Sequence, residues 1–108
     1  MSSTTEYFAF IRDQLSHTPD VSYRAMMGEY IIYCRGVVVG GIYDDRLLMK
    51  NTPAGRALMP EAQEQLPYPG GKPMLLVDNV DDPDFLRKLL EVVAAEVPSK
   101  KPKLVKTI

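Results

Sequence analysis

Hydrophobic residues recur at helical spacing near the start of the chain. Phe8, Ile11 and Leu15 are three or four residues apart, so they would share one face of an amphipathic helix. Ser3 and Glu6 precede this pattern with the spacing of a capping box, in which each side chain satisfies a free backbone N–H of the other residue. The pattern therefore predicts an N-terminal helix with one buried face.

A second helical pattern lies near the other end of the chain. Asp82 is suited to cap this helix, Pro83 fits its first position, and Pro98 would stop it. Its hydrophobic residues repeat with helical spacing and would form one core face: Leu86, Leu89, Leu90, Val93 and Val97. We expect a C-terminal helix over residues 83–97.

Strand-like segments occupy the region between residues 23 and 51. They are rich in β-branched and aromatic residues and are expected over residues 23–27, 29–35, 37–43 and 46–51. The connections, Arg35-Gly36 and Asp44-Asp45 among them, are too short for anything but antiparallel hairpins. A fifth strand is expected at residues 74–77, where a compact apolar run recurs.

One of these strands is apolar on both faces. Tyr30, Ile32 and Cys34 would point to one side and Ile31 and Tyr33 to the other. A half-exposed strand alternates between apolar and polar residues, so this strand is expected to be central. Helices or a partner subunit would cover both of its sides.

The middle of the chain, residues 52–73, is rich in proline and glycine. Thr52-Pro53 can begin a short helix that runs through Leu58, and a second short turn is expected over residues 61–66. Residues 67–71 have the composition of a loop. Together these patterns predict an α+β fold, in which an antiparallel meander of about five strands is flanked by an N-terminal and a C-terminal helix.

Length and composition fit one domain. The chain has 108 residues, of which 45% are hydrophobic and 25% charged, values typical of a globular protein. We expect a single domain over residues 1–98 and a flexible basic tail over 99–108. The N-terminus lacks the features of a secretory signal, and a single cysteine cannot form an internal disulfide, which indicates a cytoplasmic protein.

Charge is distributed unevenly along the chain. The tail holds four of the thirteen basic residues, Lys100, Lys101, Lys103 and Lys106, and no acidic residue. The remainder has nine basic and fourteen acidic residues, a net charge of −5. An acidic body repels phosphate, so direct nucleic-acid contact is expected only as weak, sequence-blind binding through the tail.

Groups able to do covalent chemistry are scarce. The single histidine, His17, follows the first helix, where a cation complements the helix dipole, and Cys34 lies in an apolar strand as a small hydrophobe. One His and one Cys cannot supply a zinc site. The aspartates from Asp78 to Asp84 fail the calcium-loop pattern and fit turns and caps better. We predict no catalytic residue, metal site or cofactor.

Several motifs, in their order and spacing, resemble the N-terminal domain of the TfoX/Sxy competence regulators. The resemblance covers roughly residues 5–97. It rests on Arg24, the Met-Met-Gly motif at 26–28 and the aromatic strand at 30–33. It also rests on the leucine-rich strand ending in Lys at 47–50 and on the segment 68–74. Met27 stands where the family usually has Phe.

The resemblance implies a regulatory role, assisting transcription of DNA-uptake genes alongside the cyclic-AMP receptor protein. It transfers no catalytic residue. Full-length regulators carry a second, C-terminal helical domain, whereas this sequence stops at Ile108.

The favoured hypothesis is a non-catalytic regulatory domain that binds another protein or a second copy of itself. The alternative is a small-ligand-binding or enzymatic domain with a cleft near Arg24, Lys50, Tyr68 and Lys72. The residues expected to take part in binding are Arg24, Met27, Gly28, Tyr30, Lys50, Tyr68 and Lys72.

Overall fold

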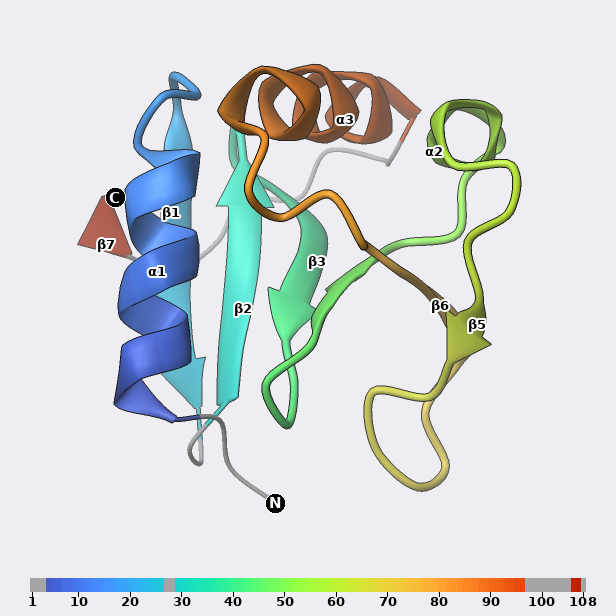
Figure 1. The fold of residues 1–108 in the computed structure, drawn as a ribbon, viewed down its shortest axis with the longest axis horizontal. Coiled ribbons are helices and arrows are strands. Elements are labelled where there is room, and N and C mark those ends of the chain that lie inside the picture. The colour runs from blue at the N-terminus through green and yellow to red at the C-terminus, as the bar shows by residue number, and fades with distance from the viewer. Residues whose placement is uncertain (1–3, 27–28, 97–105, 108) are drawn as a thin grey trace.

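A computed structural model describes residues 4–26, 29–96 and 106–107. These residues form one antiparallel sheet with three helices (Figure 1). In chain order the elements are α1 (Thr5–Leu15), β1 (Val21–Met26), β2 (Glu29–Cys34), β3 (Val37–Ile42), β4 (Leu47–Met49), α2 (Pro53–Leu58), β5 (Glu64–Gln65), β6 (Met74–Leu76), α3 (Pro83–Glu96) and β7 (Lys106–Thr107). The predicted α+β class and antiparallel meander are confirmed.

Strands β1 to β4 lie next to one another in the sheet in the order in which they follow along the chain. The full order is β5-β6-β4-β3-β2-β1-β7, so the doubly apolar strand β2 is central, as predicted. Tight turns join β2 to β3 and β3 to β4, and each has two consecutive residues with positive φ: Arg35 and Gly36 in the first, Asp44 and Asp45 in the second. Such turns match the twist of the strands that they join.

Two-residue strands extend the five predicted strands at both edges of the sheet. At one edge, Lys106 and Thr107 pair with Tyr23 and Ser22 of β1. Lys100, Lys101 and Lys103 of the predicted basic tail lie outside the described residues.

At the other edge, the structure corrects the middle segment. A second short turn was expected over residues 61–66; the structure has a turn at residues 60–61, whereas Glu64 and Gln65 form β5 and pair with β6. The Arg56 guanidinium donates to the Ala62 carbonyl at 2.9 Å and to the Glu64 carboxylate at 3.1 Å. Arg46 donates to the Gln65 side-chain oxygen at 2.8 Å. These side-chain bonds accompany the pairing of the segment with β6, which local composition could not reveal.

The first helix begins one residue later than its predicted cap. The N-cap of α1 is Thr4, whose hydroxyl accepts the Tyr7 backbone N–H at 3.2 Å, so the capping box of Ser3 and Glu6 is wrong. The Thr4 backbone N–H also donates to the Asp45 carboxylate at 2.7 Å. The N-cap residue therefore also bonds to the turn between β3 and β4.

The last helix begins as predicted. The Asp82 carboxylate accepts the Phe85 backbone N–H at 3.1 Å, and Pro83 is the first helical residue. Its buried face includes four of the five predicted core residues, Leu86, Leu89, Leu90 and Val93. The fifth, Val97, and the expected stop at Pro98 lie outside the described residues.

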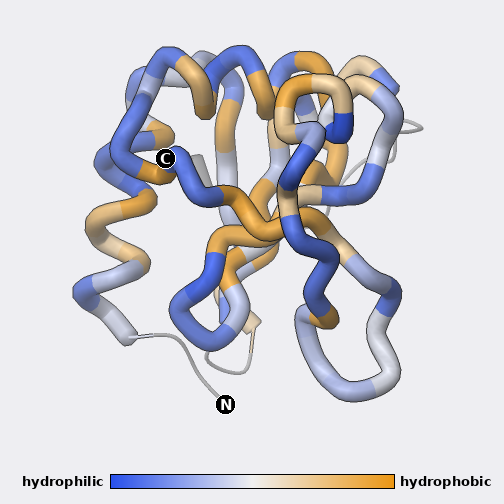
Figure 2. The backbone as a smooth tube through the Cα atoms, turned by 45° about the vertical axis from the view of Figure 1, so that its right-hand side comes forward, coloured by the Kyte–Doolittle hydropathy of each residue, from blue (hydrophilic) through white to orange (hydrophobic). Residues whose placement is uncertain are grey.

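Helices α1 and α3 cover one face of the sheet and enclose the core against β2, β3 and β4 (Figure 1). Figure 2 shows hydrophobic residues gathered along the central strands and hydrophilic residues at many of the connecting loops. No described helix covers the opposite face of the sheet, which we call the helix-free face. The expected cover of both faces of β2 is thus met by helices on one face only.

None of the three described helices has the length and apolar character needed to cross a bilayer.

Candidate functional site

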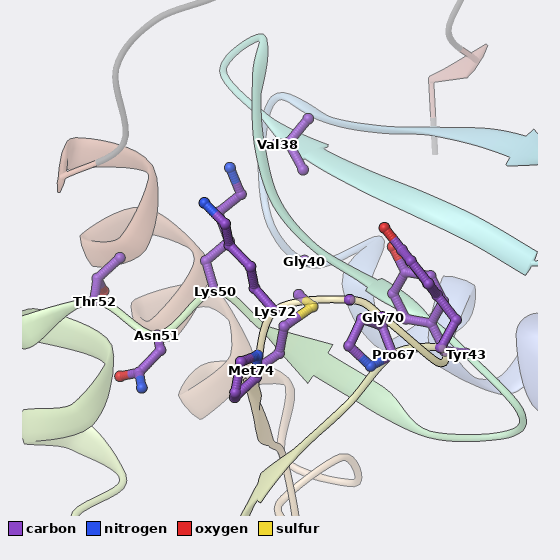
Figure 3. Close-up of a pocket in the computed structure, with 13 residues that line it drawn as sticks. Val38, Gly40, Tyr43, Lys50, Asn51, Thr52, Pro67, Gly70, Lys72 and Met74 are labelled. Atoms are coloured by element: carbon purple, nitrogen blue, oxygen red, sulfur yellow. The ribbon is translucent and has the colours of Figure 1, made fainter.

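A groove lies on the helix-free face, beside β3 and β4. It has a volume of about 620 Å³ and is open to solvent on one side. Its floor comes from β3 and from the segment that leaves β4, and its outer wall is the loop between β5 and β6 (Figure 3). The lining residues are Val38, Gly40, Tyr43, Lys50, Asn51, Thr52, Pro67, Tyr68, Gly70, Gly71, Lys72, Pro73 and Met74. We call this the lysine groove.

The outer wall is shaped by a tight turn. The Gly71 N–H donates to the Tyr68 carbonyl at 2.9 Å, which places Pro69 and Gly70 at the two central positions. Gly70 has φ +85°, and proline followed by a positive-φ glycine fits a type II turn. The sequence of this loop therefore fixes the position of Tyr68 beside the sheet.

An aromatic pair forms one end of the groove. The rings of Tyr43 and Tyr68 are 6.2 Å apart and inclined by 56°. The Tyr43 ring lies over Gly41, where an added Cβ would approach the ring Cε2 to 2.6 Å. A side chain at Gly41 would therefore displace the ring from the sheet.

The Tyr43 phenol is held in its neutral form. Burial raises the pKa of this phenol above its ordinary value, and negative charge on Tyr68, Glu29 and Tyr33 would raise it further. A neutral phenol can donate as well as accept a hydrogen bond. At neutral pH the groove thus offers a hydrogen-bonding group that adds no charge.

The opposite end of the groove is cationic. Lys50 is half-buried and Lys72 is exposed, and Figure 3 shows both side chains extending in the same direction, toward the part of β3 that carries Val38. The residues that line the lysine groove include no Asp or Glu. Asn51 and Thr52 add an amide and a hydroxyl to the same end.

A second hollow continues from the aromatic pair. It has a volume of about 530 Å³ and shares Tyr43, Pro67 and Tyr68 with the lysine groove. Its other lining residues include two carboxylates, Glu29 and Asp44, and one guanidinium, Arg46, so it is more acidic than the lysine groove. The two hollows therefore form a continuous surface that is cationic at one end and contains carboxylates at the other.

The structure brings together three of the predicted binding residues. Lys50, Tyr68 and Lys72 line the same groove, as the cleft hypothesis required, but Arg24 does not. Arg24 pairs with Ile31, which pairs with Gly41, so it is two strands away from β3 on the helix-free face.

The other predicted binding residues do not join this site. Tyr30 points to the helix side and stacks on Phe8, with ring centroids 3.8 Å apart. Met27 and Gly28 lie outside the described residues.

Sequence reasoning missed Tyr43, Asn51 and Met74 as members of the groove. A signal for Tyr43 was present, because it follows Gly40-Gly41 near the end of a predicted strand. Glycines in a strand indicate close approach by another group. Asn51 and Met74 had no such signal, because their position depends on the pairing of β4 with β6.

The two residues considered for nucleophilic chemistry have structural environments. Cys34 is fully buried, and burial raises the pKa of its thiol, which keeps it protonated. His17 is exposed just beyond the end of α1. Within the described residues, no group of three or more His, Cys, Asp and Glu side chains could hold a metal ion.

The chain is similar to a known protein family and to a curated protein of comparable length. The model of the TfoX N-terminal domain matches residues 13–94. An uncharacterized 12.7 kDa protein from the trpE 5′ region of Spirochaeta aurantia is 37% identical over 108 residues, covering 99% of this chain and 94% of the relative. No solved structure matches the chain.

Proposed function

This chain belongs to the TfoX N-terminal domain family, and on that premise we propose that it is a non-catalytic regulatory domain that binds a protein partner on its helix-free face. The observation that carries the proposal is the exposure of hydrophobic side chains around the lysine groove. Tyr68 is 58% exposed and Leu66 is 48% exposed, and both belong to the loop that walls the groove.

This surface has the composition of an interaction site. Tyrosine is enriched at the centres of protein interfaces, and methionine adapts its shape to different partners. Tyr43, Tyr68 and Met74 occur together here, with polar and charged residues around them. Hydrophobic surface bordered in this way is typical of sites that bind proteins.

The regulatory part of the proposal rests on the family. Its full-length competence regulators are attributed a role in assisting transcription, which they exert alongside another regulator. A domain with that role needs a recognition surface more than reactive side chains. Contact with DNA through the basic tail stays a prediction, since three of its four lysines lie outside the described residues.

The test compares two exposed aromatic residues on opposite sides of the molecule. Tyr68 lies on the groove wall, and Phe10, which is 43% exposed, lies on α1. Tagged wild-type, Tyr68→Ala and Phe10→Ala chains would each be used to recover partners from cells of the source organism, with quantification by mass spectrometry. We expect Tyr68→Ala to reduce recovery of a specific protein about tenfold, as truncating an interface hot spot does, and Phe10→Ala to leave it unchanged. Equal recovery by all three chains would contradict the proposed surface.

A further inference from the structure

We propose that the lysine groove binds a small molecule that joins an anionic oxygen group, phosphate or carboxylate, to a flat apolar ring. The anionic group would lie at the Lys50 and Lys72 end and the ring against Tyr43 and Tyr68. This inference goes beyond the proposed function and does not depend on it, because a ligand can bind this groove whether or not a protein partner does.

The first argument is uncompensated positive charge. Neither lysine forms an ion pair with any carboxylate in the described part of the chain. Glu64, which lies near this end, is already bound by the Arg56 guanidinium at 3.1 Å and by the Asn51 amide at 3.4 Å. Two ammonium groups therefore line one hollow of a chain whose net charge is −1. An anion bound in this hollow would be attracted by both ammonium groups.

The second argument is the orientation that the surrounding charges impose. Beyond the aromatic pair, the adjoining hollow contains the carboxylates of Glu29 and Asp44 and one cation, Arg46. The Arg46 guanidinium already donates to the Tyr43 carbonyl at 3.1 Å and to the Gln65 side-chain oxygen at 2.8 Å. The two carboxylates outnumber the one guanidinium, so this hollow disfavours an anion relative to the lysine end, which has two cations and no carboxylate. A ligand with a single anionic head is therefore oriented, with its head at the lysines and its body toward Tyr43.

The third argument is the surface available to the body of the ligand. Besides the lysines and the tyrosines, the groove is lined by the apolar side chains of Val38, Pro67 and Met74. Tyrosine and proline rings provide flat apolar surfaces, and a thioether makes favourable contacts with aromatic rings. The groove volume of about 620 Å³ lies within the range of ordinary small-molecule sites.

The charges of the two hollows also favour this small ligand over an acidic peptide. An extended peptide that filled both hollows would carry its negative charges past Glu29 and Asp44. A compact molecule with one charged end avoids that repulsion. The geometry therefore favours a small molecule over a long acidic segment.

The test uses phenyl phosphate and benzoate as complete probes, and inorganic phosphate and phenol as the two halves. Each would be titrated into the isotope-labelled chain while backbone amide signals are recorded by NMR. We expect one of the complete probes to saturate with a dissociation constant below about 1 mM, about tenfold or more tighter than either half. The amides of Asn51, Gly70 and Gly71 should move most. The tighter of the two complete probes identifies the head group.

Lysine variants test the position of the head group. Lys50→Met and Lys72→Met, which keep the length of the side chain, should each weaken binding by about tenfold, the scale of one lost charge-assisted contact. Lys88→Met, on the exposed surface of α3, is the matched control and should bind like the wild type. Lys72 lies in an exposed loop, so its variant remains informative even if Lys50→Met impairs folding.

Several results would overturn the inference. The first is that neither complete probe shows saturable binding, and the second is that inorganic phosphate or phenol binds as tightly as both complete probes. The third is equal binding by the Lys72→Met and Lys88→Met chains. The fourth is that an acidic peptide of four glutamates binds more tightly than both complete probes. The partner-recovery experiment would be unaffected by any of them, so failure of this inference and failure of the proposed function can be told apart.

Discussion

At the scale of single residues, two glycines in β3 decide how closely its neighbours can approach. A Cβ on Gly40 would overlap the Leu48 carbonyl oxygen of the adjacent strand, and a Cβ on Gly41 would lie 2.6 Å from both the Tyr30 carbonyl oxygen and the Tyr43 ring. The pairing of β2 with β3 also shifts by one residue at this point, between Ile32 and Tyr33. Gly40 therefore allows the backbone of β4 to approach closely, and Gly41 leaves room for the Tyr30 carbonyl oxygen and the Tyr43 ring.

Gly40→Ala should therefore be severely destabilising. We expect a loss of about 3 kcal/mol in the free energy of unfolding, because backbone atoms of β4 would have to move. Gly70→Ala is the matched control: its φ of +85° strains an alanine, but nothing lies within 4 Å of the added carbon, so the cost should be about 1 kcal/mol. Urea unfolding of both variants measures the difference, and a smaller loss at Gly40 than at Gly70 would refute the steric explanation.

The Tyr43 phenol should make stability depend on pH in the alkaline range. Its folded-state pKa is raised above the unfolded value of about 10, so the neutral form is favoured in the folded state. The contribution of the neutral phenol to stability is then fully present below pH 10. It is lost as the pH rises through the folded-state pKa, because the unfolded chain gives up this proton more readily than the folded chain does. The free energy of unfolding, measured by urea titration from pH 8 to about 11, should fall less steeply in Tyr43→Phe than in the wild type. Identical slopes would show that Tyr43 titrates as it does in the unfolded chain.

At the scale of elements, the short helix α2 is capped by the residue that precedes it, Thr52. The Thr52 hydroxyl accepts the Gly55 backbone N–H at 3.1 Å, and Pro53 follows at the first helical position. Gly55 lies close to Val93 of α3, where an added Cβ would come within 3.2 Å of the Val93 side chain. Thr52 therefore lines the lysine groove and also caps the helix that packs against α3.

Thr52→Ala should lower the free energy of unfolding by about 1 kcal/mol, the usual value of a lost N-cap. Thr52→Ser keeps the hydroxyl and should cost clearly less. Thermal or urea unfolding of the three chains provides the comparison. If serine and alanine were equally destabilising, the methyl group rather than the hydrogen bond would account for the effect of Thr52.

Local patterns predicted the elements better than their contacts. The spacing of Leu86, Leu89 and Leu90 and the cap at Asp82 identified α3 because helix signals lie within a few residues of each other. At the first helix the local pattern offered both Ser3 and Thr4 as caps, and the bond of the Thr4 N–H to Asp45, 41 residues away, is not visible in it. Strand β5 was missed because it is defined by its pairing with β6, about ten residues further along the chain.

The candidate site was predicted in part. Lys50, Tyr68 and Lys72 could be selected as polar residues beside apolar strands, and the groove joins them. Their meeting depends on β6 pairing with β4, which no local pattern specifies. Arg24 was grouped with them although it lies two strands away from β3, because sequence alone gives no strand order.

At the scale of the whole molecule, the sheet separates two roles. One face packs α1 and α3 around the core and holds the buried Cys34. The other face has no helix in the described residues and bears a groove, two lysines and exposed hydrophobic side chains. We infer that the first face provides stability and the second provides recognition.

The most direct test of this division is photo-crosslinking in living cells. A benzoyl-phenylalanine would replace Tyr68 on the helix-free face in one chain and Phe10 on α1 in the other, two aromatic positions with comparable exposure of 58% and 43%. We predict a discrete adduct with one protein, or with a second copy of the chain, from position 68 and none from position 10. Adducts from position 10 alone, or an equal background from both positions, would contradict recognition through the helix-free face.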